Sequence, residues 1–327
     1  MPFSNIIGQT AIKNRLSVSL NAENMPMLAQ PLLVGERGSG KTEIADAYAT
    51  ALAQKMGVEV LKYNSPSEFR HVDSPEWQNL KNWFLNDKDG VLIIDEIHHI
   101  NIKPTVQMTT VFNFLLKALD GQNTGKTLHF QTTYNPDGSA NSTYTTFDKS
   151  RKVVILLTNH VDKVDAALMS RMDCCTMAPY TADEMEQLAV LQLSKFELAA
   201  SDDVVVKMLA KSARGIGRPL YEMAKHIHRM GINMVTQEIA VKAMQQMDMF
   251  PHGLQMAEIT LLEHARKPIS NKVAGMLVTS LQSNIGNTVS YLAGVCRFLT
   301  LAHNGTFQLS ERGAKYLKSL KTFGFIG

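Results

Sequence analysis

The stretch that decides the fold is PLLVGERGSGKT, residues 31–42. Its first four residues are apolar throughout and have the length of a short strand that is buried on both faces. Residues 35–42, GERGSGKT, match the phosphate-binding pattern G-x-x-x-x-G-K-T, and a helical pattern follows over residues 42–54. In this pattern the glycines let backbone N–H groups surround phosphate oxygens beside the positive end of the helix. The stretch therefore predicts a nucleotide-binding loop between a strand and a helix.

Two residues of this loop have distinct predicted roles. Lys41 would reach the β and γ phosphates of ATP, and the hydroxyl of Thr42 would bind Mg²⁺. ATP and Mg²⁺ are therefore the predicted cofactors. The whole loop is assigned to nucleotide binding: Gly35, Glu36, Arg37, Gly38, Ser39, Gly40, Lys41 and Thr42.

Two further apolar runs end in polar residues that suit phosphoryl transfer. Residues 91–94 lead into Asp95 and Glu96, which would lie beside the Mg²⁺ and the attacking water respectively. Residues 153–157 lead to Asn159, whose amide would hold the same water, although an Asn here would equally well cap a turn. Phosphoryl transfer depends on positioning of the metal and the water, so Glu96 predicts hydrolysis rather than binding alone.

Strand and helix patterns alternate through residues 1–179, which predicts an α/β domain with a parallel sheet. Residues 127–150 depart from this alternation. Two Thr-rich and aromatic alternating runs, 128–134 and 142–147, flank the turn-prone NPDG of residues 135–138, which predicts an inserted β-hairpin. Residues 180–252 show helical patterns only, so a small all-helical domain is expected there.

Residues 253–327 predict a winged helix. Three helical patterns precede two short runs, 298–302 and 306–309, on either side of an Asn-Gly turn signal. Residues 251–327 carry eight Lys or Arg and three Asp or Glu, a net charge of +5, which leaves −2 for residues 1–250. A basic segment on a slightly acidic body indicates contact with a polyanion; a solvated lysine-rich surface is the alternative.

The overall composition excludes several classes of protein. With 327 residues, 45% hydrophobic and 19% charged, the chain is neither disordered nor collagen-like. No apolar run approaches the roughly 18 residues of a membrane helix, and the N-terminus lacks a secretory signal pattern. Three cysteines make no disulfide framework. A cytoplasmic protein without a membrane partner is expected.

In their order and spacing, these motifs resemble those of the AAA+ ATPases. The resemblance implies that Arg171 is a finger that enters the site of a neighbouring subunit. It implies that Arg218 contacts the γ-phosphate of its own chain, and it adds Pro219 to the nucleotide-binding residues. Residues 3–9, FSNIIGQ, are similar to the family's adenine-wrapping segment. The other nucleotide-binding residues that the resemblance implies are Ile6, Ile7 and Tyr180.

Within the AAA+ ATPases, the chain resembles the RuvB family of Holliday-junction branch-migration motors. The similar segments are LIIDEIHH at 92–99, SDD at 201–203 and ARGIGR at 213–218. The resemblance implies an ATP-driven, hexameric ring that moves duplex DNA or four-way junctions in recombination and repair. It also implies that the hairpin at 127–150 docks a RuvA-like partner, although an ordinary exposed hairpin is the alternative.

The predicted wing tip, HNGT at 303–306, contains no arginine, whereas the wing of RuvB is basic. The predicted DNA contacts therefore fall on other cations, namely Lys272, Arg297, Arg312 and Lys315. A loader or switch, and an ATP-dependent DNA-binding adaptor that recruits a replication or recombination protein, remain open. The hairpin favours the motor, because most loader ATPases of the family lack one.

His98, His99 and His160 lie near the predicted nucleotide site in the sequence. Their spacing does not match that of a zinc site. Structural roles or solvent exposure are therefore predicted for all three.

Overall fold

The computed structural model describes residues 2–21, 29–69, 74–86, 88–101, 106–120, 127–134, 137, 139–146, 152–278, 285–302 and 305–326. The chain forms two compact units, residues 1–179 and 180–327. The further division of the second unit at residues 252 and 253 stays a prediction.

The first unit is built on a parallel sheet with the strand order β2-β3-β6-β1-β7. The predicted α/β class with a parallel sheet is confirmed. Ligands of open α/β sheets bind outside the carboxyl ends of the strands, which is where the phosphate-binding loop follows β1. The strands are β1 (Pro31–Val34), β2 (Val60–Tyr63), β3 (Gly90–Ile94), β6 (Lys152–Thr158) and β7 (Asp173–Thr176).

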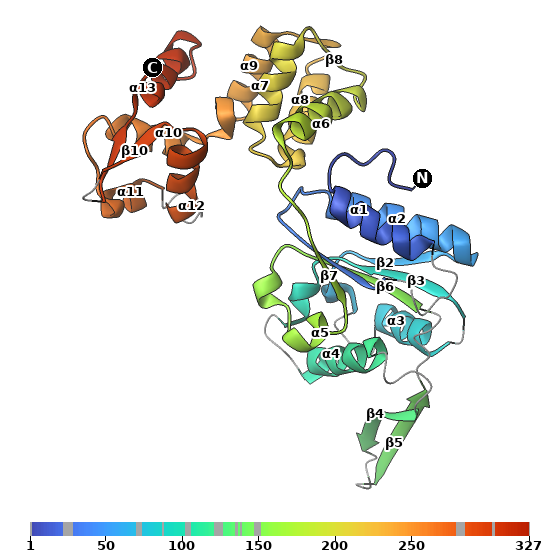
Figure 1. Ribbon diagram of the computed structural model, residues 1–327. Coiled ribbons are helices and arrows are strands. Elements are labelled where there is room, and N and C mark those ends of the chain that lie inside the picture. The colour runs from blue at the N-terminus through green and yellow to red at the C-terminus, as the bar shows by residue number, and fades with distance from the viewer. Residues whose placement is uncertain are drawn as a thin grey trace. The chain divides into compact units, whose positions relative to one another are not determined.

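Helices cover both faces of this sheet (Figure 1). Successive strand side chains point to opposite faces, so Leu33 and Ile155 pack with α1 and α2, whereas Leu32 and Leu156 pack with α3 and α4. Both layers consist of buried apolar side chains, which explains why β1 and β3 carry no polar side chain. The helices are α1 (Thr10–Leu20), α2 (Lys41–Met56), α3 (Pro75–Leu85), α4 (Val106–Leu119) and the single turn α5 (Ala166–Met169); short 3-10 segments span Pro66–Phe69, Ile97–Asn101 and Val161–Lys163.

The predicted insertion forms a hairpin of β4 (Thr127–Tyr134) and β5 (Ala140–Thr146). The two strands pair antiparallel, with Tyr134 opposite Ala140 and a register shift between His129 and Gln131. The hairpin extends away from the sheet beyond α4 (Figure 1). Residues 135, 136, 138 and 147–150 of the insertion lie outside the described residues.

The second unit begins with a helical region. Thr181 and Glu184 form a capping box at the start of α6, and Asp202 caps the start of α7, where its carboxylate accepts a hydrogen bond from Val205 N. Two-residue strands β8 (Ala199–Ala200) and β9 (Met234–Val235) pair in parallel, because the segments that enter α7 and α9 run side by side. The helical patterns of the sequence do not predict this pair. The helices are α6 (Ala182–Ser194), α7 (Asp203–Ser212), α8 (Gly217–Arg229) and α9 (Gln237–Gln246).

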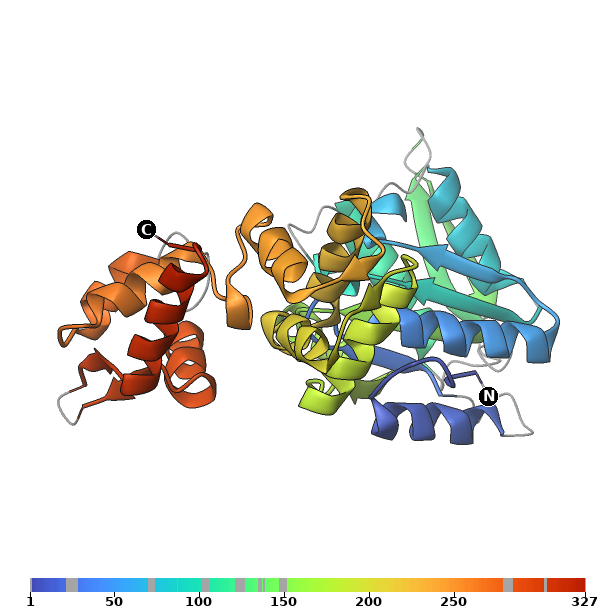
Figure 2. The same ribbon diagram turned by 90° about the horizontal axis from the view of Figure 1, so that it is seen from above.

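The rest of the second unit has the order expected of a winged helix, with one addition. Three helices precede a hairpin, and then α13 (Glu311–Thr322) packs beside α10 (Figure 2). The sequence patterns missed α13, which Ser310 caps by accepting a hydrogen bond from Gly313 N. Residues 303 and 304 of the wing lie outside the described residues. The elements are a turn at Pro251–Gly253, α10 (Met256–His264), α11 (Asn271–Val278), α12 (Ile285–Ser290) with a π turn at Tyr291–Val295, β10 (Leu299–Leu301) and β11 (Phe307–Leu309).

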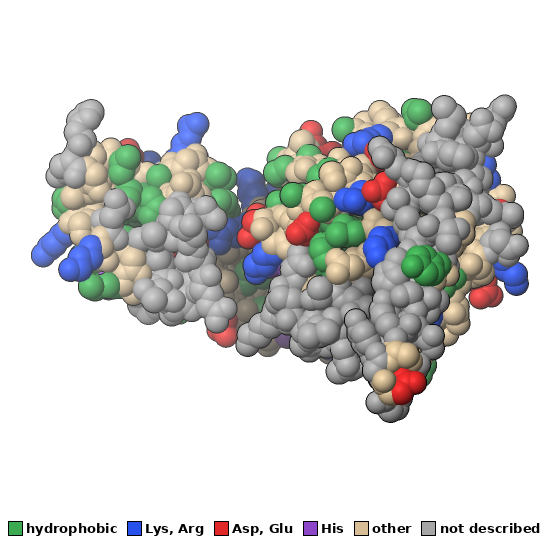
Figure 3. Space-filling model, turned by 90° about the horizontal axis from the view of Figure 1, so that it is seen from below, with side chains coloured by type: hydrophobic (Ala, Val, Ile, Leu, Met, Phe, Trp, Pro, Cys, Tyr) green, Lys and Arg blue, Asp and Glu red, His purple; other side chains and the backbone are tan. Residues whose placement is uncertain are grey.

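Surface properties add two observations. Lys and Arg side chains project from the visible face of the C-terminal part of the second unit (left in Figure 3). In the described part of the chain, none of the helices has both the length and the apolar character that crossing a bilayer requires.

Candidate nucleotide-binding site

The phosphate-binding loop leaves the sheet at the end of β1 and runs into α2. Gly38 and Gly40 have φ angles of 85° and 90°, a backbone region that glycine adopts without steric cost. At Gly35 the requirement is space, because a Cβ there would lie 2.7 Å from Met177 Cβ. The glycines thus hold a tight turn against the first turn of α2, whose N–H groups have no partners within the helix.

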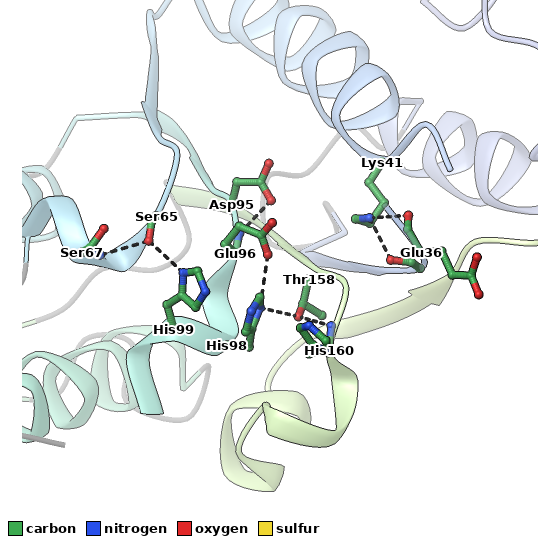
Figure 4. Close-up of polar contacts among 11 residues, drawn as sticks. Glu36, Lys41, Ser65, Ser67, Asp95, Glu96, His98, His99, Thr158 and His160 are labelled. Atoms are coloured by element: carbon green, nitrogen blue, oxygen red, sulfur yellow. Dashed lines mark hydrogen bonds and ion pairs between the residues drawn. The ribbon is translucent and has the colours of Figure 1, made fainter. Parts of the chain in front are cut away.

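Lys41 is the first residue of α2, and its side chain folds over the loop. Its ammonium donates hydrogen bonds to the carbonyl oxygens of Gly35 (2.8 Å) and Glu36 (2.9 Å) (Figure 4). Burial lowers the pKa of this ammonium, and the nearby carboxylates of Asp95 and Glu96 oppose that effect. A partly desolvated cation at the mouth of a glycine turn is well placed to bind phosphate.

Asp95 and Glu96 follow directly after β3, at the same edge of the sheet. Asp95 Oδ1 accepts a hydrogen bond from Glu96 N at 2.7 Å, and Asp95 N donates to Tyr63 O at 2.9 Å. Burial raises the pKa of Asp95, the Glu96 carboxylate adds to that effect, and the Lys41 ammonium counters it. Glu96 has a φ of 49°, a left-handed conformation that costs free energy in a residue with a Cβ.

Asn159 follows β6, the strand beside β3. Ile94 lies opposite Leu156 in the register of the two parallel strands, so the polar residues that follow β3 and β6 lie at the same edge of the sheet. Both Asn159 Oδ1 and Glu96 Oε2 are buried, and neither accepts a hydrogen bond from any described residue.

This set of groups fits ATP and Mg²⁺. The glycine turn and the Lys41 ammonium offer donors for phosphate oxygens, while Asp95 offers a carboxylate of the kind that binds Mg²⁺ together with substrate phosphates. Thr42, the next Mg²⁺ ligand expected, lies exposed in the first turn of α2. The two buried acceptors, Glu96 Oε2 and Asn159 Oδ1, match the two protons that a water molecule can donate.

The N-terminal segment is tied to the end of the first unit. The Gln9 side chain donates to Ala178 O (2.7 Å) and accepts from Ala178 N (3.0 Å). Ile6 packs against the cluster under α1 and α2, and Ile7 is half-buried. The contact of Ile6 and Ile7 with adenine stays a prediction.

Arg171 lies in a turn after α5 and is held by its own chain. Its guanidinium forms an ion pair with Asp120 at 3.0 Å and donates to Ala167 O at 2.6 Å. Asp120 follows α4, on the segment that leads toward the hairpin. The predicted role of Arg171 in a neighbouring site would require this ion pair to open.

The remaining predicted nucleotide residues belong to the second unit. Tyr180 opens that unit, and Arg218 and Pro219 lie in the first turn of α8, where Arg218 is exposed. Their assignment to the nucleotide stays a prediction.

Three buried polar side chains at the site are not among the predicted functional residues. Thr158 and Gln9 were given no role of their own, and His98 was assigned a structural one. All three are buried polar residues with side-chain hydrogen bonds. In the sequence each is a polar residue that follows apolar residues. Such a pattern does not indicate which residue its side chain will bond to.

Comparison with known proteins agrees with this geometry. The model of the ATPase family associated with various cellular activities (AAA) matches residues 31–180. A mutant of RuvB from Thermotoga maritima is 22% identical, with a TM-score of 0.63 and coverage of 97% of each chain. The RuvB Holliday junction branch migration motor of that organism is 21% identical, with a TM-score of 0.61 and coverage of 95% of each chain.

A more distant structure shares part of the fold. The FIGL-1 AAA domain in complex with ADP is 15% identical and has a TM-score of 0.51, covering 74% of this chain and 82% of that one. No curated relative matches the chain in sequence. Residues 31–180 therefore have the fold of an AAA ATPase domain, and along nearly its whole length the chain has the fold of RuvB.

Proposed function

We propose that the protein is an ATP-hydrolysing ring motor that moves duplex DNA and drives branch migration at four-way junctions. The observation that carries the proposal is the gathering of Lys41, Asp95 and Glu96 at one edge of the sheet (Figure 4), within a chain of the RuvB fold. Asn159 follows β6 at the same edge. RuvB itself is the branch migration motor among the similar structures.

In this proposal the first unit performs the chemistry. The loop N–H groups and Lys41 hold the phosphates, and Thr42 and Asp95 hold Mg²⁺, which supplies charge neutralisation for phosphoryl transfer. Glu96 and Asn159 orient the attacking water through the two buried oxygens. Glu96 accepts a proton from that water.

The proposal gives a role at the nucleotide to each of two arginines. Arg171 would leave Asp120 and enter the site of the next subunit, where such a finger adds about 10³–10⁵ in rate. Arg218, with Pro219 and Tyr180, would read the nucleotide bound to its own chain. A hexamer is proposed because of the resemblance to RuvB.

The hairpin of β4 and β5 is the proposed docking element for a RuvA-like protein. It extends from the ATPase unit, and Tyr144 on β5 is 61% exposed. A large aromatic side chain in this position is typical of a protein interface.

DNA contact is proposed for the cations of the second unit. A groove of about 490 Å³ is lined by Arg266, Lys318, Lys321, Leu309 and Ala314. Within the described residues, none of its three cations forms an ion pair. Lys315, by contrast, pairs with Glu311 at 2.7 Å. The groove is therefore a stronger candidate for a phosphate contact than Lys315, which the sequence had favoured.

Reversing the charge of the groove will weaken binding to duplex DNA. The variant is R266E/K318E/K321E, and its comparison is K272E/R297E/K315E, which reverses three of the cations predicted from sequence. The slope of log K against the logarithm of the salt concentration is negative, and each lost phosphate contact should reduce its magnitude by roughly 0.9. Fluorescence anisotropy with labelled duplex at several salt concentrations measures both quantities. Greater loss in the comparison variant would assign the contact to the sequence-predicted set.

The motor itself is tested by ATP turnover of the protein alone, with linear duplex and with a synthetic four-way junction. Each turnover measurement is paired with a gel assay of junction dissociation. Stimulated turnover with ATP-dependent junction movement is the expected result. Stimulation without movement, even after a RuvA protein is added, would favour a loader or adaptor, and no response to DNA would remove nucleic acid from the function.

A further inference from the structure

Behind the acidic pair lies a cluster of three histidines that the reaction described above does not use (Figure 4). His98 is in the centre: its ring centroid lies 4.3 Å from that of His99 and 4.8 Å from that of His160. The side chain of His98 is only 3% exposed. A buried imidazole needs hydrogen-bond partners, and the atoms around His98 Nδ1 indicate its role.

His98 Nδ1 faces two oxygen atoms that come from different strands. It lies 3.1 Å from Thr158 Oγ1 and 3.4 Å from Glu96 Oε2. Thr158 ends β6, and Glu96 follows β3, so the imidazole bridges the carboxyl ends of two adjacent strands. Glu96 Oε2 accepts no hydrogen bond from any described residue, and His98 Nδ1 is the polar atom that lies beside it.

The charge state of His98 favours a directed contact. Burial, with the neighbouring His99 and His160, lowers the pKa of His98 to about 4, so the ring is neutral near pH 7 and carries one proton. If Nε2 carried that proton, the lone pair of Nδ1 would face the Glu96 carboxylate, which is unfavourable. The Nδ1–H tautomer instead points its proton at Thr158 Oγ1 and toward Glu96 Oε2.

Thr158 is a fixed anchor for this contact. Its side chain is fully buried, and its hydroxyl oxygen accepts a hydrogen bond from His160 N at 3.0 Å. It also directly precedes Asn159, the other residue proposed to orient the water. Whatever holds Glu96 to Thr158 therefore also sets the position of Glu96 relative to Asn159.

We propose that His98 is a positioning residue that ties the carboxylate of Glu96 to the end of β6. The inference rests on the proposed ATP hydrolysis and extends it. Glu96 needs such a tie because its backbone is in a left-handed conformation, which its surroundings must maintain. The tie keeps Glu96 Oε2, after β3, at a fixed distance from Asn159 Oδ1, after β6, so both oxygens face the water in a fixed geometry.

Two substitutions separate positioning from simple filling of space. H98F keeps an aromatic ring but has no Nδ1, whereas H98N places an amide near the position of Nδ1 and leaves a cavity. A space-filling role predicts that H98F is the milder change. Positioning predicts the reverse order: H98F should lower kcat about 10–100-fold with ATP affinity unchanged, because small misplacements of a reacting group have effects of this size, and H98N should recover much of the loss.

Further variants guard against a folding defect. H98Q keeps polarity and bulk but places its amide near Nε2, so it should lose kcat as H98F does. H99F is the matched control, since His99 Nδ1 contacts Ser65 Oγ at 3.2 Å rather than Glu96, and its kcat should stay close to that of the parent. In an E96Q background, H98F should cause no further loss, since groups that act as a unit are not additive.

The experiment uses the full chain, with steady-state turnover, ATP affinity by titration and far-UV circular dichroism for each variant. The inference stands if H98F and H98Q lose kcat, H98N recovers it and ATP affinity is constant. It falls if H98F turns over ATP at the parent rate, or if H98N is slower than H98F. A parent chain without any ATP turnover would overturn the proposed function as well, so the two failures are distinguishable.

Discussion

E96Q will reduce ATP turnover by about 10²–10⁴-fold, the usual contribution of a positioned general base, and will leave ATP affinity nearly unchanged. The amide keeps the size of the side chain and one oxygen, so the loop and Lys41 still hold the phosphates. What disappears is the carboxylate whose buried Oε2 accepts no hydrogen bond from a described residue and can accept a proton from water. Phosphate release and nucleotide titration measure the two quantities separately.

The matched control is E43Q, which makes the same chemical change in the first turn of α2. Glu43 also contributes an electrostatic effect at Lys41, but it is exposed and does not end a strand of the sheet. Turnover near the parent rate is expected for E43Q. Unchanged turnover in E96Q would move water activation to another residue, and full biological function of E96Q would favour the adaptor.

R214A will destabilise the second unit by about 3–5 kcal/mol, the usual effect of removing one partner of a buried ion pair. Arg214 donates to both carboxylate oxygens of Glu258, at 3.1 and 3.0 Å, and stacks on the Tyr291 ring, with 3.8 Å between the guanidinium carbon and the ring centroid. The Glu258 side chain is only 2% exposed, so without Arg214 its charge would be buried and uncompensated.

Because of where the tryptophans lie, urea unfolding can be followed separately in the two units. The chain has two, Trp77 and Trp83, and both lie in α3 of the first unit. In urea, tryptophan fluorescence therefore follows the first unit, while circular dichroism follows both. R214A should shift the dichroism transition without an equal shift in fluorescence, and K315A, which breaks the exposed Lys315–Glu311 pair, should shift neither. An unchanged dichroism transition in R214A would contradict the prediction.

Arg214 makes a long-range contact that the sequence patterns do not predict. The ARGIGR stretch at 213–218 predicts a nucleotide contact for Arg218, but it predicts no role for Arg214. In the structure Arg214 joins the end of α7 to α10, across the boundary predicted at residues 252 and 253. Gly253 makes this contact possible, because a Cβ there would lie 2.3 Å from Ser212 O. An ion pair between residues 44 positions apart leaves no local pattern.

The sequence by itself determined the parallel sheet, the phosphate-binding loop and the acidic pair. Each depends on a local rule: strands covered on both faces must be apolar throughout, a glycine turn must precede a helix, and polar residues must end the strands where the ligand binds. Only the tertiary structure decided that His98 joins Glu96 to Thr158, that Asp120 holds Arg171, and that Arg266, Lys318 and Lys321 share a groove. These contacts arise between segments brought together by packing, and packing depends on side-chain shape and burial across the whole fold.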